Sequence, residues 1–271
     1  MFTATNLKTG LGVFASVLVL SLTAPLANAA AIHDAAQFTT IFPGNDDGST
    51  ALVSTGFNFN FFGVTRSNLF VNNNGNVTFG SPDGTFTPSA ITGISAPRLA
   101  PFFADVDTRI GATVTYGTGT IGGRNVFGVN WINVGYFSQQ TNRTNSFQLI
   151  ITDRSDIAAG DFDFEFNYDR ILWETGSASG GVNGFGGTSA VAAWTSGNGT
   201  FFQFPGSLVN GALLDGGPNA LINGSLNSNT AGQYIFRVRN GQVNNVPEPA
   251  SLALMGLGLA GLAFARKRKS T

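Results

Sequence analysis

Phenylalanine residues alternate with polar residues in several short runs, and this period of two constrains the fold more than any other feature of the sequence. The run DFDFEFNY at 161–168 alternates acidic residues with phenylalanine, and GFNFNFFG at 56–63 alternates asparagine with phenylalanine. Successive side chains of a β-strand point to opposite faces of its sheet, so each run has one apolar and one polar face. Both runs therefore predict strands whose phenylalanines face a core.

Turn signals separate such runs along 30–246. NLFVNNNGNVTFG at 68–80 predicts two short strands joined at Asn74-Gly75, a dipeptide that readily takes the positive φ angles of a tight hairpin. QYIFRVRNG at 233–241 predicts a last strand, and the glycine-rich stretch 175–189 predicts a long surface loop. No sustained helical spacing of apolar residues occurs in this region. We therefore expect a single all-β domain, β-sandwich-like, with long loops rich in glycine and asparagine.

Composition indicates how this domain is stabilised and which binding partners it disfavours. Cysteine is absent, so disulfides and thiolate metal sites are excluded and stability must come from a hydrophobic core. Residues 30–246 contain 14 acidic residues, 9 arginines and no lysine, for a net charge of −5. This negative balance disfavours nucleic acid and anionic lipid as partners.

The first 29 residues have the features of a signal peptide. Lys8 supplies a positive charge, the apolar stretch at 11–22 is too short to span a membrane comfortably, and small residues precede the cleavage site at Ala27 and Ala29. We expect a signal helix in 1–29 and cleavage after Ala29. The alternative is a retained N-terminal anchor.

Four aspartates are candidate ligands for a hard cation. Asp105 and Asp107 are two residues apart at an expected strand end, so their carboxylates are expected to point the same way. Asp46 or Asp47 can join them from a loop, and such oxygen ligands suit calcium. The simpler interpretation, which the sequence favours, is that Asp105 and Asp107 bind backbone amides at a turn and pair with Arg109. No other cofactor is expected.

A second acidic group raises the question of catalysis. Asp161, Asp163 and Glu165 resemble the paired acids of a glycoside hydrolase, but their alternation with phenylalanine predicts the solvated face of a half-buried strand. His33 is the only histidine and lies next to the expected cleavage site, where a flexible terminus is expected. We therefore expect no catalytic residues.

The three tryptophans are candidates to stack on sugar rings. Trp131 and Trp173 have apolar neighbours and are expected to be in the core or half-buried. Trp194 lies beside the polar segment TSGNGTFF and is the candidate ligand-binding residue. A glycan-binding module would need such an aromatic side chain exposed in a cleft beside polar groups.

The segment 247–271 has three parts. Pro247, Glu248 and Pro249 keep the backbone extended. An apolar run of 16 residues at 250–265 predicts a transmembrane helix only about 24 Å long, at or below the usual minimum for a span. Four basic residues that favour the cytoplasmic side then follow, Arg266, Lys267, Arg268 and Lys269. So short a span suits a temporary anchor.

Seven segments follow one another between residues 38 and 240 in this order: NDDGST, FNFFG, LFVNNNGNVTFG, LAPFFADVDTR, VNWINVGYF, NSFQLIIT and FEFNYDRILWETG. In this order the chain resembles the nidogen-like (NIDO) domain. The resemblance implies extracellular matrix association or cell-matrix adhesion and brings no catalytic residues. Animal members stand beside disulfide-rich modules, which this sequence lacks, so a specific basement-membrane role is not implied.

The tail at 247–271 resembles the PEP-CTERM sorting signal of bacteria that make exopolysaccharide. The resemblance implies that an exosortase cuts at or near Pro247-Glu248-Pro249 and releases the protein or passes it to a surface acceptor. A permanent C-terminal membrane anchor is the alternative.

The expected organisation is a signal peptide (1–29), a nidogen-like β domain (30–240), a linker (241–246) and the sorting signal. We predict a non-enzymatic exported protein of the cell surface or extracellular matrix, held transiently in the inner membrane, that binds exopolysaccharide or other matrix components. A glycan-binding module with defined specificity and a matrix-acting hydrolase are the alternatives.

Overall fold

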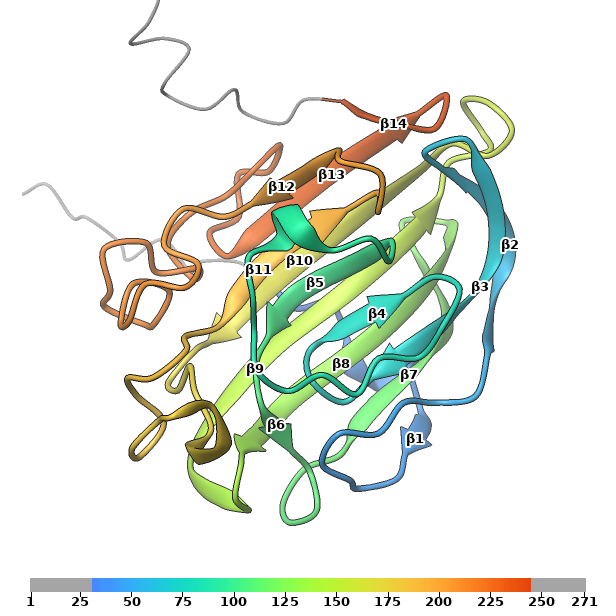
Figure 1. Cartoon of the computed structure of the whole chain (residues 1–271). Coiled ribbons are helices and arrows are strands. Elements are labelled where there is room, and N and C mark those ends of the chain that lie inside the picture. Colours follow the sequence, from blue (N-terminus) through green and yellow to red (C-terminus); the bar gives the residue numbers. More distant parts are fainter. Residues whose placement is uncertain (1–30, 245–271) are drawn as a thin grey trace, which may run out of the picture.

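The computed structural model describes residues 31–244, which form an all-β domain (Figure 1). Its strands are β1 (Thr40–Phe42), β2 (Val53–Phe61), β3 (Val64–Asn72), β4 (Asn76–Thr78), β5 (Arg98–Phe103), β6 (Val106–Asp107), β7 (Val114–Ile121), β8 (Arg124–Tyr136), β9 (Gln140–Asp153), β10 (Phe162–Arg170), β11 (Val191–Thr195), β12 (Phe201–Gln203), β13 (Gln233–Arg239) and β14 (Gln242–Asn244). Three short 3-10 helices accompany them, η1 (Ala35–Gln37), η2 (Ile91–Gly93) and η3 (Ser177–Ser179).

The two helices predicted at the chain ends, in 1–29 and 250–265, lie outside the described residues. Within 31–244 there is no helix of the length and apolar character that a membrane crossing requires.

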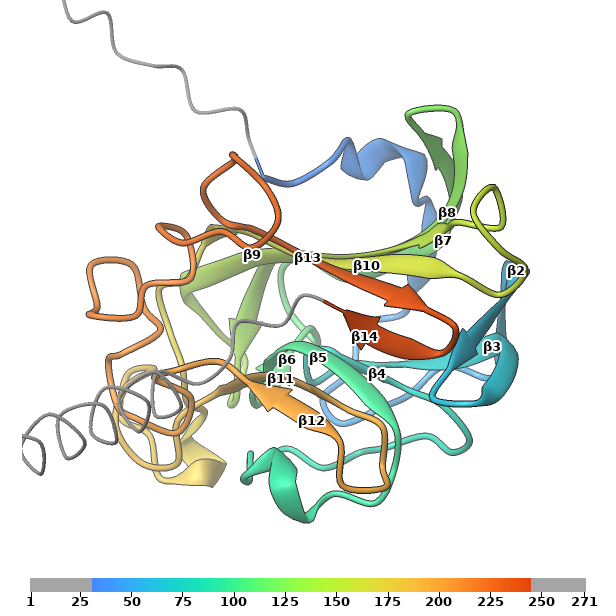
Figure 2. The same ribbon diagram turned by 90° about the horizontal axis from the view of Figure 1, so that it is seen from above.

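The strands form two sheets that face each other (Figures 1 and 2). The larger sheet has eight strands in the order β1-β7-β8-β9-β10-β13-β14, with β6 paired to β8. The smaller sheet has six, in the order β12-β11-β5-β4-β3-β2. The view from above shows the two sheets as separate layers. Two packed sheets confirm the prediction of an all-β sandwich.

Aromatic side chains from both sheets fill the interior. Phe162, Phe164 and Phe166 of β10 are fully buried, as their alternation predicts. The Phe164 ring stacks on Phe236 of β13 at 4.8 Å, and Phe162 meets Phe59 of the smaller sheet at 4.9 Å. Each buried aromatic side chain removes roughly 150–250 Å² from water. This interior is therefore the main source of stability in a domain without disulfides.

The β3–β4 hairpin forms where the asparagine run predicts it, but its loop is longer than expected. Asn72 pairs with Asn76, which leaves three loop residues at 73–75. Of these only Gly75 has a positive φ angle, at +71°. The turn is thus a three-residue loop and not the two-residue loop that Asn74-Gly75 predicts. The carbonyl oxygen of Gly75 accepts a hydrogen bond from the backbone N–H of Phe102, so the loop lies against β5.

The expected last strand, β13, is followed by a further one. Asn240 and Gly241 both have positive φ angles, and the chain turns back through them into β14. The predicted linker at 241–246 therefore begins with an edge strand of the larger sheet.

The first described residues lie across the outer face of the larger sheet (Figure 2). Phe38 is buried there with Val126 and Ile150, on the side opposite the main core. His33 Nε2 lies 2.8 Å from Glu165 Oε2 of β10. The expectation of a flexible terminus at His33 is therefore wrong, because the segment is bound to the sheet by an apolar and a polar contact.

Candidate functional site

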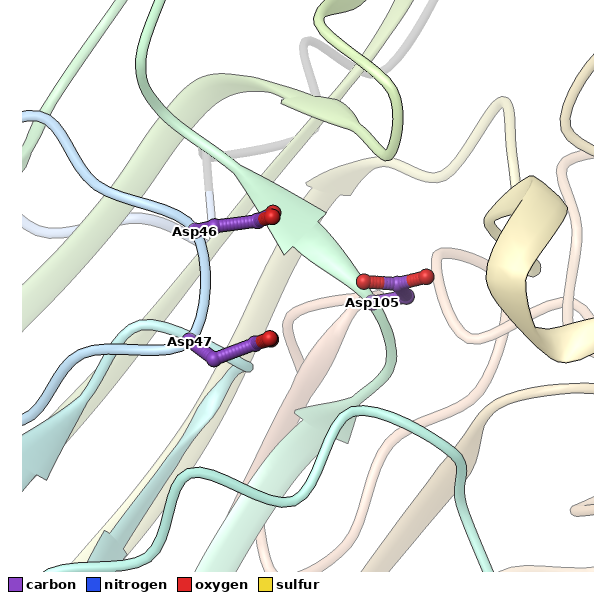
Figure 3. A group of neighbouring side chains, drawn as sticks. All are labelled: Asp46, Asp47 and Asp105. Carbon is purple, nitrogen blue, oxygen red and sulfur yellow. The ribbon is translucent and has the colours of Figure 1, made fainter.

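Three aspartates from two segments converge beside the smaller sheet. Asp46 and Asp47 belong to the connection between β1 and β2, and Asp105 belongs to the link between β5 and β6. One carboxylate oxygen from each lies within 4.8 Å of the other two. In Figure 3 the side chains of Asp46 and Asp47 point toward Asp105. The structure thus brings together three of the four aspartates that the sequence singles out.

The β3–β4 turn holds the two segments of this acidic cluster in place. The side-chain amide of Asn73 donates to the backbone carbonyl of Asp46, and that of Asn74 donates to Asp47 Oδ1 at 2.9 Å. Asn74 Oδ1 also accepts the backbone N–H of Val106, at 2.9 Å. Both asparagines are buried. The sequence run NNNG predicted only a turn, and this positioning role was not foreseen because it depends on contacts with distant segments.

Asp107, the fourth candidate, is paired with Arg109. Its carboxylate accepts hydrogen bonds from Arg109 Nε at 3.0 Å, from Arg109 Nη2 at 2.5 Å and from the backbone N–H of Gln139 at 2.7 Å. Burial alone would raise the pKa of Asp107, but the hydrogen bonds from Arg109 and Gln139 hold it below its ordinary value. Its carboxylate oxygens are therefore already hydrogen-bonded, and Asp107 is not among the three converging residues.

Asp105 joins the acidic cluster and Asp107 does not, because a tight turn separates the two residues. The backbone carbonyl of Ala104 accepts the N–H of Val106 at 2.9 Å, so the chain reverses locally around Asp105. The alternation of side chains that holds along a strand does not hold across such a turn. The sequence prediction treated the two residues as neighbours on one strand face and could not see this break.

The acidic cluster is electrostatically unfavourable as it stands. Asp105 is only 1% exposed, and its Oδ2 has no hydrogen-bond partner among residues 31–244. Burial, together with the charges of Asp47, Asp46 and Asp107, raises the pKa of Asp105 to about 7. Burial and the charges of Asp107 and Asp47 likewise raise the pKa of Asp46 to about 6, although Arg109 Nη2 lies 3.1 Å from its carboxylate.

The second acidic group, on β10, is paired with arginines and is not solvated. Asp163 is 7% exposed and lies between Arg154 Nη1 at 2.6 Å and Arg239 Nη1 at 2.7 Å. Asp161 is also buried, and Glu165 contacts the histidine of the N-terminal segment. The prediction of a solvated face is therefore wrong. A glycoside hydrolase needs two carboxyl groups facing each other across a groove, and these acids are instead engaged in ion pairs.

The tryptophans are all buried. Trp131 and Trp173 are fully buried, which confirms their expected place in the core. Trp194 is 2% exposed, and its ring stacks on Phe62 at 5.6 Å. It lies on β11, between β5 and β12, where every residue of the strand is buried. The expectation that Trp194 stacks on a sugar is therefore corrected, because its ring faces the sandwich interior.

The residues expected to take part in processing and sorting lie outside the described residues. They are Ala27 and Ala29 at the signal cleavage site, and Pro247, Glu248, Pro249, Arg266, Lys267, Arg268 and Lys269 in the tail.

Family comparisons identify the described domain. The nidogen-like domain profile matches residues 67–124 and 117–240, which span most of both sheets. The chain belongs to the nidogen-like domain family. A second profile, for the PEP-CTERM protein-sorting motif, matches residues 245–269, directly after the nidogen-like domain. Both resemblances seen in the sequence are confirmed. Together they indicate an exported, extracellular protein that is recognised by an exosortase.

Curated relatives with a similar region include the alpha-tectorins of three species. Alpha-tectorin of Gallus gallus is 29% identical over 279 residues, covering 93% of this chain and 12% of the relative. The proteins of Homo sapiens and Mus musculus are each 30% identical over 239 residues, covering 77% of this chain and 10% of the relative. This chain therefore spans about a tenth of the length of these relatives. No solved structure gives a significant match.

Proposed function

We propose that this protein is a non-enzymatic component of the cell surface or extracellular matrix, that it adheres to exopolysaccharide, and that an exosortase processes its C-terminus. The observation that carries the proposal is the order of the two family matches. The nidogen-like match ends at residue 240 and the sorting motif begins at residue 245. An exported domain with a removable tail would be delivered to the outer surface, where matrix polysaccharide is available.

A polar pocket on the larger sheet supports binding to acidic sugars. The pocket has a volume of about 710 Å³ and is lined by Arg154, Arg237, Arg239 and Asn244. Arg154 and Arg239 already pair with aspartates. Arg237 is exposed and makes no ion pair within the described residues, so its guanidinium is available to a carboxylate or sulfate of a polysaccharide.

Mass spectrometry of the exported protein, purified from its producing organism, tests the processing step. We expect the mature C-terminus to lie at or near Pro247-Glu248-Pro249 and to lack Arg266–Lys269. Glu248→Gln is expected to leave the tail uncut, whereas Asn245→Ala, which lies outside the tripeptide, is expected to be processed normally. A mature pool that keeps the four basic residues would contradict the proposal.

Retention of the purified protein on the organism's own exopolysaccharide tests adhesion. We expect retention at low salt that weakens as salt rises, because exposed charges are screened. Arg237→Ala is expected to reduce retention, and Arg124→Ala, an exposed arginine outside the pocket, is expected to leave it unchanged. If the unmodified protein is not retained at low salt, with or without calcium, adhesion to this polymer is refuted.

A further inference from the structure

The buried Asp105 carboxylate has no hydrogen-bond or ion-pair partner among residues 31–244. Native structures pair nearly all buried polar atoms, and an unpaired one calls for an explanation such as a bound ion. Asp105 Oδ2 and Asp46 Oδ1 are both buried and both without a hydrogen-bond partner among residues 31–244. The Asp105 side chain is 1% exposed and its carboxylate accepts no hydrogen bond from residues 31–244, which indicates a missing positive charge beside it.

No described side chain supplies that charge in full. Arg109 is the cation that contacts the cluster, through Asp46, and its guanidinium already makes two hydrogen bonds to Asp107. The carboxylates of Asp46, Asp47 and Asp105 together carry three negative charges when ionised. A divalent cation between them would offset most of that charge and give the buried Asp105 carboxylate a partner.

The shape of the cluster also leaves a place for an ion. Each of the three aspartates offers an oxygen within 4.8 Å of the others, which is the spread expected for ligands at about 2.4 Å from one calcium ion. Asp105 Oδ2 faces Gly176, where a Cβ atom would lie only 2.2 Å from it, and the other carboxylate oxygen of Asp105 faces Asp46 and Asp47 (Figure 3). Asp47 is exposed, so water can complete the coordination from that side.

We propose that Asp46, Asp47 and Asp105 bind one calcium ion, which ties the β1–β2 connection to the β5–β6 link. All the ligands are oxygens, which suits calcium or magnesium and not a softer metal. Calcium fits better, since it accepts irregular oxygen geometry with six to eight ligands, whereas magnesium demands a near-ideal octahedron. Three carboxylates with open positions match the weak calcium sites of extracellular modules, with Kd of about 10⁻⁴ to 10⁻³ M.

Calcium titration of the purified, chelator-treated protein tests the site, by calorimetry and by the Tm. We expect one bound ion with a Kd in the range of about 10⁻⁴ to 10⁻³ M, a rise in Tm, and weaker binding of magnesium. Asp105→Asn and Asp47→Asn are each expected to weaken calcium binding at least about tenfold. Asp47 is exposed, so its variant reports on the site even if the buried substitution disturbs folding. Asp156→Asn, on an exposed ion pair elsewhere, is the matched control and should bind as the unmodified protein does.

Absence of binding heat and of any Tm change up to about 10 mM calcium would overturn the proposal, as would unmodified affinity in both cluster variants. Magnesium binding as tight as calcium would overturn the choice of metal. The titration contains no polysaccharide, so its outcome is independent of the adhesion test.

Discussion

Replacing Gly75 with alanine should damage both the sandwich and the acidic cluster. Gly75 ends the three-residue loop that carries Asn73 and Asn74, and it has a φ angle of +71°. A Cβ atom at this position would lie 1.8 Å from the carbonyl oxygen of Phe102 in β5. That oxygen belongs to the backbone and cannot rotate away. The loop and the strand would therefore have to move apart by more than about 1 Å, since nonbonded heavy atoms sit about 3.5–4.0 Å apart at their optimum.

The expected cost can be built from two contributions. The positive φ angle alone costs an alanine roughly 1–2 kcal/mol, partly offset by the lower entropy of its unfolded chain. Separation of the loop from β5 would also break the hydrogen bond from the Phe102 N–H to the Gly75 carbonyl. Leaving such buried groups unpaired costs about 1–3 kcal/mol. We therefore expect Gly75→Ala to lower the free energy of unfolding by about 3 kcal/mol.

Gly63→Ala is the matched control for this substitution. Gly63 also has a positive φ angle, +84°, in the β2–β3 turn, but a Cβ atom there would meet nothing within 4 Å. It should lose only about 1 kcal/mol. Urea unfolding followed by tryptophan fluorescence measures both variants, because all three tryptophans are buried. Equal destabilisation of the two variants would refute the steric argument, since it would show that the Phe102 carbonyl imposes no additional cost.

Three further predictions concern ion pairs and the buried tryptophan. Burial alone would raise the pKa of Asp83, but hydrogen bonds from Thr85 and the Arg98 guanidinium, 2.7 Å away, lower it below 3.8. Asp83→Asn should therefore cost about 2 kcal/mol at pH 7, and the difference should fade below about pH 4, as the carboxylate of the unmodified protein becomes protonated. An unchanged difference in unfolding free energy at pH 3 would contradict this. Asp163→Ala should cost about 2 kcal/mol because it leaves two arginines facing each other. Asp156→Ala, on exposed ion pairs, should cost much less, and similar losses in the two variants would be inconsistent with the burial argument. Trp194→Phe should leave exopolysaccharide retention unchanged, and a marked loss would mean that this ring reaches the ligand after all.

Local patterns were sufficient to predict the strands and the sandwich. The alternation at 161–168 placed Phe162, Phe164 and Phe166 in the core, where the structure has them. This works because a strand has a fixed period of two, and a chain without cysteine has to bury its aromatic residues together. The same pattern could not show what covers the opposite face of β10. Of the arginines paired with Asp163, Arg154 directly follows β9 and Arg239 lies on β13, and local periodicity does not encode strand order.

The prediction for Trp194 failed for a related reason. Its polar neighbours along the chain suggested exposure, but its ring points into the space between the two sheets, where it meets Phe164 of β10 and Phe236 of β13. Neighbours along the chain say little about burial when the neighbours in space come from other strands.

The sequence by itself determined that this chain is an all-β domain, with a sorting motif that follows it, because strand periodicity and the sorting pattern are local. Only the tertiary structure determined which acidic side chains lie close together. Asp46 and Asp47 lie close to Asp105 because the β3–β4 turn hydrogen-bonds to both loops. Asp107 is separated from Asp105 by one tight turn and pairs with Arg109. Carboxylate positions of this kind depend on contacts between segments far apart in the chain, and one-dimensional spacing does not encode them.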